Sequence, residues 1–112
     1  MREGELVLAL LPQADGQSKN RPALFLRALP PFGDALLCGV STQLAREVKG
    51  FDEVITASDA DFSSRGLVAA SLFRLGFLAV IPVNQLVGSI GHISTERHQR
   101  LLRNLGKYLL KK

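Results

Sequence analysis

Paired prolines separate two apolar runs near the start of the chain, within Leu29-Pro30-Pro31-Phe32-Gly33-Asp34. Proline offers no N–H to a β-ladder and Gly-Asp favours a turn, so this segment ends one strand and precedes another. The flanking runs, residues 21–28 and 35–42, are short and mostly apolar. Because strands joined by so short a turn pair antiparallel, the sequence predicts a β-hairpin over residues 21–42.

Further apolar runs extend the β pattern in both directions. Residues 5–11 are apolar nearly throughout, as in a strand that is covered on both faces or that forms a barrel wall. Residues 68–75 and 77–82 predict two more strands, and Gly76 between them favours a bulge or a bend. Residues 88–93 predict a last, glycine-bearing strand.

The segment between the hairpin and the later strands is less regular. Residues 43–48 fit one helical turn, and residues 51–56 fit a weak strand. Residues 58–62 contain Asp59 and Asp61 among cap and turn residues, which predicts a capped turn.

A C-terminal helix is predicted over residues 94–110. Ser94 is a good N-cap, and Glu96 in the first turn complements the helix dipole. Apolar residues recur at helical spacing: Leu101, Leu102, Leu105, Tyr108 and Leu109. The opposite, basic face carries Arg97, Arg100, Arg103, Lys107 and Lys111.

Length and composition fit one small globular domain. The chain has 112 residues, of which 46% are hydrophobic and 21% charged, and this excludes a disordered tail as its main feature. Five or six short strands and one terminal helix predict a mainly β fold, a small half-open barrel with the helix against one end. We expect a single domain over residues 1–112, with the barrel at 4–93 and the helix at 94–110.

The net charge of +4 is unevenly distributed. Residues 94–112 carry six Lys or Arg against one Glu, a charge of +5, so the remainder of the chain is at −1. The charge of the main body therefore does not require a polyanionic partner. No apolar run reaches the roughly 18 residues that span a bilayer, and the N-terminus is charged. We expect a soluble, cytoplasmic protein without a membrane partner.

Several site chemistries lack the residues they need. Metal ligation has only Cys38, His92 and His98 to draw on besides carboxylates, and their spacing does not fit a site. Cys38 lies in an apolar run and is expected to be buried and inert. The acids at 59 and 61 lack the Gly and Glu of a calcium loop, and no phosphate-binding glycine loop or nucleophile elbow occurs. No cofactor is expected.

Basic and hydroxyl side chains remain at the strand ends. In the predicted hairpin, Arg21 at the start of one strand lies beside Ser41 and Thr42 at the end of the next. Arg74 near the end of a later strand adds a second cation. Such a group can hold a phosphodiester and stabilise the charge that develops when a ribose 2′-hydroxyl attacks it. The alternative is that the two hydroxyls only bond to local backbone.

Six segments in this order and spacing resemble the PemK/MazF family of toxin endoribonucleases. They are Gly4-Glu5-Leu6-Val7, Arg21-Pro22-Ala23-Leu24, Val40-Ser41-Thr42-Gln43, Gly66-Leu67, Ser71-Leu72-Phe73-Arg74-Leu75 and Ile90-Gly91-His92-Ile93-Ser94. The resemblance covers almost the whole chain. It implies an SH3-like β-barrel that forms a homodimer, binds single-stranded RNA near the dimer interface, and is inhibited by an antitoxin. DNA is then contacted only through the antitoxin.

The same resemblance implies metal-independent cleavage that leaves a 2′,3′-cyclic phosphate. By position, Arg21, Ser41 and Arg74 match the family's catalytic residues, and Lys19, Thr42 and Gln43 are assigned to RNA binding. Some members place an aspartate two residues after the second arginine, where this chain has Gly76.

An evident general base is therefore missing, and Asp59 or Asp61 can replace it only if their loop folds back toward the site. Two hypotheses follow: a toxin ribonuclease, or a non-catalytic binding module of the same fold acting through an antitoxin, a regulatory DNA complex or a topoisomerase-like target. An adaptor for proline-rich peptides is disfavoured, because the chain has no Trp, one Tyr and six scattered Phe to build an aromatic groove.

Overall fold

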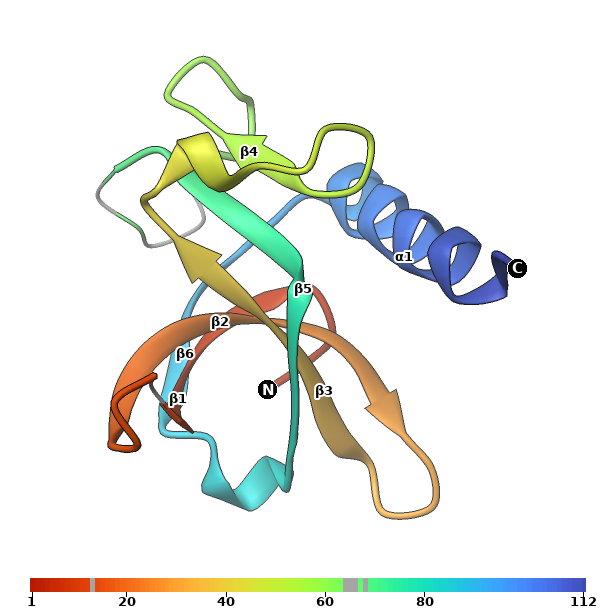
Figure 1. Ribbon diagram of the computed structural model, residues 1–112. Coiled ribbons are helices and arrows are strands. Elements are labelled where there is room, and N and C mark those ends of the chain that lie inside the picture. Colours follow the sequence, from red (N-terminus) through yellow and green to blue (C-terminus); the bar gives the residue numbers. More distant parts are fainter. Residues whose placement is uncertain (13, 64–66, 68) are drawn as a thin grey trace.

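The computed structural model describes residues 1–12, 14–63, 67 and 69–112, which form a curled antiparallel sheet and a C-terminal helix (Figure 1). Within these residues the strands are β1 Glu5–Pro12, β2 Ser18–Leu29, β3 Asp34–Ser41, β4 Glu53–Ile55, β5 Ser71–Ile81 and β6 Gly88–His92. The helical elements are the 3₁₀ turns η1 Leu44–Arg46 and η2 Val83–Gln85 and the α-helix α1 Thr95–Leu110. The strand order is β4-β5-β3-β2-β1-β6, so β4 and β6 are the edges of a half-open barrel.

The predicted hairpin is present. β2 pairs antiparallel with β3, from Ala23 opposite Gly39 to Leu29 opposite Asp34. Gly33 in the turn has a φ of +77°, a conformation that glycine reaches without a Cβ clash. The register shifts by one residue between Phe25 and Arg27, so the turn sets the pairing only up to this irregularity, and the shift sets it beyond, toward Arg21.

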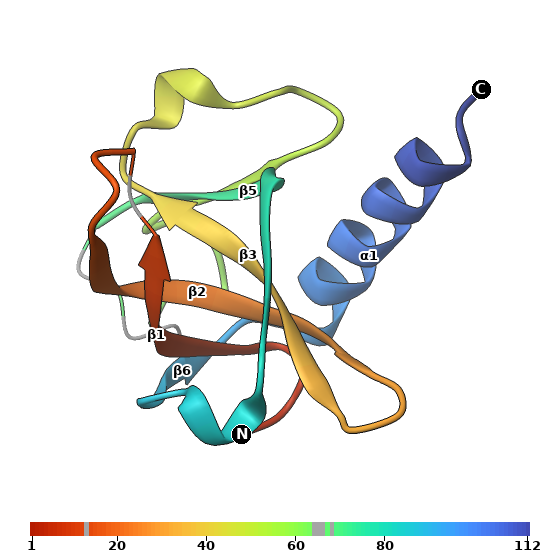
Figure 2. The ribbon, with the colours of Figure 1, turned by 60° about the horizontal axis from the view of Figure 1, so that its bottom comes forward.

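Both faces of the sheet are covered, which explains why the strands are so apolar. On one face, Leu6, Leu24 and Phe73 pack with Leu101 and Leu105 of α1. On the other face, inside the barrel, a second core contains Val7, Ala9, Ala23, Phe25, Leu37 and Leu86. Figure 2 shows the strands curling around this interior, with η1 and η2 at opposite ends. The prediction that the first strand is covered on both faces holds for the first half of β1, where Leu6 and Val7 are fully buried, but not at Leu10, which is 56% exposed.

The two strands predicted on either side of Gly76 are one strand, β5. The ladder with β3 continues across the glycine with a register shift, because Gly39 pairs with Arg74 while Cys38 pairs with Leu78. The expected irregularity at Gly76 is thus a bulge within a strand and not a break between two. The predicted first residue of that strand, Val68, lies outside the described residues.

The helix α1 begins as predicted, with the Ser94 hydroxyl accepting the Arg97 N–H at 3.1 Å. Leu101 and Leu105 are buried. Tyr108 and Leu109, which the spacing placed on the same packed face, are 59% and 70% exposed. Tyr108 still contacts Phe51, with ring centroids 5.1 Å apart, so the last turn of the helix packs at the edge of the core and is not buried in it. Neither α1 nor the 3₁₀ turns of the described chain could span a membrane.

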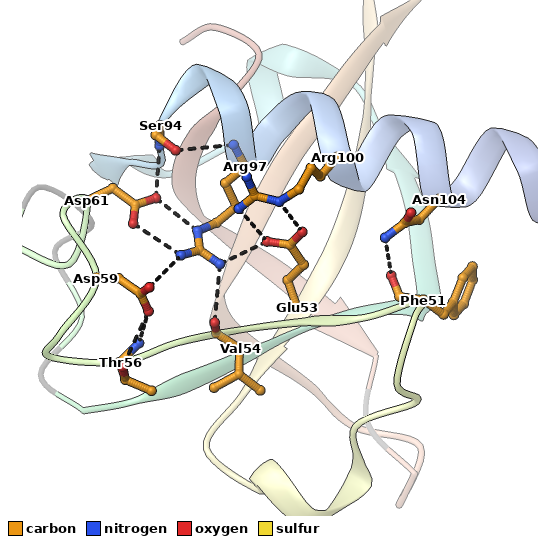
Figure 3. Close-up of polar contacts among 10 residues, drawn as sticks. All are labelled: Phe51, Glu53, Val54, Thr56, Asp59, Asp61, Ser94, Arg97, Arg100 and Asn104. Carbon is orange, nitrogen blue, oxygen red and sulfur yellow. Dashed lines mark hydrogen bonds and ion pairs between the residues drawn. The ribbon is translucent and has the colours of Figure 1, made fainter.

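Arg97 departs from the sequence prediction, because it is only 5% exposed and not part of a solvated face. Its guanidinium donates to Asp61 and Glu53, each at 2.9 Å, and lies 3.5 Å from Asp59. Arg100 binds Glu53 as well, at 2.7 Å (Figure 3). This acid cluster ties the first half of α1 to β4 and to the turn that follows it.

Candidate functional site

A cavity of about 440 Å³ lies where the beginning of β2, the end of β3, η1 and the middle of β5 meet. Its polar lining consists of Arg21, Ser41, Thr42, Gln43, Arg46, Ser71 and Arg74. Its other lining residues are Leu11, Pro12, Ala14, Pro22, Gly39, Val40, Leu67 and Phe77. The volume is within the range of ligand-binding pockets.

Five of the six site residues proposed from the sequence line this one cavity: Arg21, Ser41, Thr42, Gln43 and Arg74. The hairpin register brings the first two together, because Ala23 pairs with Gly39, and Arg21 and Ser41 continue outward from that pair. Lys19 does not line the cavity. It lies farther along β2, opposite Leu11, and is exposed.

Three guanidinium groups in the lining have no partner among the residues that the structure describes. The side chains of Arg21, Arg46 and Arg74 form no hydrogen bond or ion pair with the described residues, whereas Arg97 and Arg100 are bound to carboxylates. The described lining also contains no carboxylate and no imidazole. The cavity is therefore strongly cationic, and its donors are available to an anion.

The Ser41 hydroxyl both bonds to local backbone and lines the cavity, so the two alternatives given for it in the sequence are compatible. Its hydroxyl oxygen accepts the backbone N–H of Gln43 at 3.0 Å, which forms a local turn. A hydroxyl that accepts in this way still has its own hydrogen to donate. Because Ser41 also lines the cavity, this geometry suits it to donate to an anion and not to act as a base.

Arg46 was missed as a site residue by the sequence analysis. It belongs to η1, the helical turn predicted at residues 43–48, and its N–H bonds to the Gln43 carbonyl at 3.1 Å. The available signal was a basic residue on a short turn directly after Ser41 and Thr42. Only the chain path places that turn against the cavity.

Asp52 joins the segment after η1 to β5, two elements that contribute residues to the cavity. This side chain is 6% exposed, and its carboxylate accepts the N–H of Val48 at 2.9 Å and the N–H of Leu75 at 3.0 Å. Val48 follows η1, and Leu75 follows Arg74. The carboxylate therefore fixes the backbone next to two of the three free arginines.

The two acids considered as a substitute base are engaged elsewhere. Asp59 and Asp61 bind Arg97, and neither lines the cavity (Figure 3). Burial by itself raises the pKa of Asp61, but hydrogen bonds from Arg97 and from the Ser94 N–H outweigh it and bring the pKa below its usual value. The loop at residues 59–61 thus folds toward α1, so the condition under which it could supply a base, that it folds back toward the site, is not met.

The remaining positions of interest from the sequence lie apart from the cavity. Gly76 is exposed and does not line it. Cys38 is buried, and burial followed by the charge of Asp52 raises the pKa of its thiol, which disfavours a reactive thiolate. No group of His, Cys, Asp or Glu that could hold a metal occurs in the part of the chain that the structure describes. Gly66 of the family-like motif lies outside that part.

A second cavity, of about 300 Å³, lies at the beginning of α1 and has a different character. It is lined by Glu3 and Glu5 as well as by His92 and His98. Nε2 of His98 lies 2.8 Å from the Leu26 carbonyl oxygen, which occupies one ring nitrogen. With two carboxylates in its wall, this cavity suits an anion less well than the one lined by three arginines.

No protein-family model matches the chain, and no curated protein sequence does. Among solved structures, the chain is similar to the Mycobacterium tuberculosis toxin MazF-mt6. The TM-score is 0.69 at 20% sequence identity, and the match covers 96% of this chain and 99% of that chain. At this identity the match shows the fold. The mainly β half-barrel with a C-terminal helix, expected from the resemblance to MazF-like toxins, is confirmed.

Proposed function

We propose that this chain is the toxin of a type II toxin–antitoxin pair and that it cleaves single-stranded RNA without a metal ion. The observation that carries the proposal is a cavity lined by the Ser41 hydroxyl and by three arginines that have no partner among the described residues. The shared fold with a MazF toxin supports the same reading. An antitoxin, a second copy of this chain in a homodimer and a cytoplasmic setting are the partners and location that go with it.

The proposed reaction is an internal transfer within the RNA. The 2′-hydroxyl oxygen of one ribose attacks the adjacent phosphorus and loses its proton, while the bond from phosphorus to the 5′ oxygen of the next nucleotide breaks. That 5′ oxygen takes up a proton. The products are a 2′,3′-cyclic phosphate and a 5′-hydroxyl, and two negative charges develop on the phosphorane in between.

The cavity can stabilise those charges. We assign Arg21 and Arg74 to the non-bridging phosphate oxygens, because a guanidinium presents paired donors that match them. The Ser41 hydroxyl donates to the same group. Donors fixed in place before the reaction stabilise a charged transition state at little reorganisation cost. Thr42 and Gln43 at the rim, and Lys19 beyond it, are assigned to binding the flanking RNA.

This scheme still needs a group that accepts the proton of the attacking 2′-hydroxyl. The described lining offers guanidinium, hydroxyl and amide groups, none of which accepts a proton readily near neutral pH. We therefore assign the proton to hydroxide from solvent, which makes the enzyme slow near neutral pH. The same observation favours a second candidate, a binding module of this fold that has lost cleavage and acts through an antitoxin or another macromolecule.

RNA end mapping after brief expression tests the proposal. We expect wild type to produce defined RNA 3′ ends that carry 2′,3′-cyclic phosphate, and Arg21→Ala to produce none. Arg103→Ala, a basic residue exposed on α1 outside the cavity, is the matched control and should cleave like wild type. Growth arrest that persists in Arg21→Ala without new RNA ends would favour the binding module.

A further inference from the structure

We infer that Arg46 binds a second phosphate of the RNA, next to the one that is cleaved. The ligand of this cavity is then an oligonucleotide that presents consecutive phosphodiesters, and a single phosphate group leaves one cation unmatched. This inference rests on the proposed function and adds a binding residue and a minimum substrate to it.

The charges in the cavity call for a second phosphate. Each phosphodiester carries one negative charge, and the phosphorane formed during cleavage carries two. Arg21 and Arg74 together match that phosphorane. Arg46 is a third unpartnered cation in the same lining, and the described lining contains no acid to neutralise it. A neighbouring phosphate of the same RNA strand supplies the missing negative charge.

Arg46 lies on an anchored turn of the cavity wall, which suits it to bind a ligand. Arg46 lies on η1, directly after the strand end that carries Ser41, and lines the same cavity from this separate element. The turn is held at both ends. The Ser41 hydroxyl binds the Gln43 N–H at its start, and Asp52 binds the Val48 N–H after it. A basic residue on a turn anchored in this way is positioned for a ligand, unlike one on a loose loop.

The cavity is large enough for more than one phosphate group. About 440 Å³ is far more space than one phosphate group occupies, and Pro22, Leu67 and Phe77 provide apolar lining beside the cations. A nucleotide places a base and a sugar next to each phosphate. The mixture of free guanidiniums and apolar surface therefore fits a stretch of RNA strand better than inorganic phosphate.

Binding of an uncleavable RNA tests this inference. The probe is a short 2′-O-methyl oligoribonucleotide of random sequence, because the blocked 2′-oxygen cannot attack and phosphate contacts do not depend on sequence. Fluorescence anisotropy over a series of salt concentrations measures affinity for wild type, Arg46→Ala, Arg46→Lys, Arg21→Ala and Arg103→Ala. A contact to one single-strand phosphate contributes about 0.7 to the slope of log K against log salt.

We expect Arg46→Ala to reduce that slope by about 0.7 and the affinity by about fivefold at 0.1 M salt. Arg46→Lys should keep the slope, because the charge remains, and Arg103→Ala should match wild type. With a cleavable RNA, Arg46→Ala should raise KM and leave kcat nearly unchanged, whereas Arg21→Ala lowers kcat. Circular dichroism melting verifies that each variant is folded.

Two other outcomes separate this inference from the function it rests on. If Arg46→Ala keeps the wild-type affinity and slope while Arg21→Ala weakens binding, Arg46 is no phosphate ligand and the proposed function stands. If wild type itself does not bind the probe and leaves cleavable RNA intact, the proposed function is wrong, and the inference about Arg46 is wrong as well.

Discussion

Arg21 and Ser41 occupy the two open ends of one hairpin, and their side chains line one cavity. The sequence predicts that the two strand ends lie near each other, because a short turn of prolines, glycine and aspartate joins the strands. The exact register at Arg21 and Ser41 also depends on a one-residue shift between Phe25 and Arg27, which the sequence does not indicate. The sequence proposed Arg74 as a second cation of this site, and the structure has it in the same cavity lining, but the sequence did not indicate Arg46. Their placement depends on contacts between strands that are distant along the chain.

The missing proton acceptor has a measurable consequence at the level of single residues. A guanidinium keeps its proton across the ordinary pH range, and a hydroxyl keeps its own. If hydroxide accepts the proton of the attacking 2′-hydroxyl, the cleavage rate should rise about tenfold per pH unit between pH 6 and pH 9. Single-turnover cleavage of an RNA with a mapped site measures this. A bell-shaped profile would contradict the assignment and point to a base from outside the described lining.

Gly76 allows the missing carboxylate to be restored. A Cβ built at this position meets no atom within 4 Å, and the backbone has no positive φ there, so Gly76→Asp should fold normally. We expect its stability within about 0.5 kcal/mol of wild type, as for surface changes in general. If the added carboxylate reaches the site, cleavage near pH 6 should accelerate at least about tenfold, since general bases contribute more than that.

Gly76→Ser is the control for the Gly76→Asp experiment. It adds a side chain at the same open position without a carboxylate and should keep the wild-type rate and pH dependence. A normally folded Gly76→Asp protein with wild-type kinetics would mean that this position cannot deliver a base.

At the scale of elements, Asp52 is the link that aligns η1 with β5. The sequence predicts only a weak strand at residues 51–56 and does not indicate this role of Asp52, because the role depends on where Val48 and Leu75 come to lie. The carboxylate spans the two segments with one oxygen for each N–H. Sequence patterns report local periodicity and give little information about such a bridge.

Asp52→Asn tests the bridge. An amide has only one acceptor oxygen, so one of the two buried N–H groups would face an NH₂ group and lose its partner. We expect the free energy of unfolding in urea to fall by about 1–3 kcal/mol. RNA affinity should fall as well, because the backbone beside Arg46 and Arg74 loosens.

Asp15→Asn is the matched control for the bridge. Asp15 is exposed and accepts only the nearby Gln17 N–H, a turn that asparagine also forms, so stability and affinity should stay at wild-type values. An Asp52→Asn protein with unchanged stability and unchanged RNA affinity would contradict the role of Asp52 in stabilising the fold and positioning the arginines.

The elements themselves were predicted unevenly. The hairpin, the first strand and α1 carry strong local signals, and the structure has them close to the expected positions. β5 was divided at Gly76 because glycine often ends a strand, yet pairing with β3 on both sides of the bulge keeps it continuous. Arg97 was placed with the other basic residues of its helix, and only the folded loop at residues 59–61 reveals that carboxylates surround it.

At the scale of the whole molecule, the acid cluster around Arg97 connects the helix to the sheet. The two apolar cores cover the two faces of one sheet, and α1 adds Leu101 and Leu105 to one of them. Glu53, Asp59 and Asp61 hold the beginning of that helix through Arg97 and Arg100. The docking of α1 should therefore depend on the ionisation of carboxylates.

Acid unfolding tests this dependence through Asp61. Its pKa is lower in the folded chain than in the unfolded one, so it stabilises the fold above the unfolded pKa, about 3.9, and that contribution is lost as the pH falls through the folded value. In urea titrations from pH 7 to pH 2.5, wild type should lose stability below about pH 4. Asp61→Asn should be less stable by about 1–3 kcal/mol at pH 7 and should lose less on acidification.

The two curves should therefore converge at low pH, where the wild-type carboxylate is protonated and resembles the amide. Asp15→Asn should follow wild type at every pH, because its side chain is exposed. An equal gap between wild type and Asp61→Asn at pH 7 and pH 2.5 would contradict an electrostatic role. The cluster would then hold α1 through packing and neutral hydrogen bonds, and the carboxylate charges around Arg97 would not be what keeps the helix against the barrel.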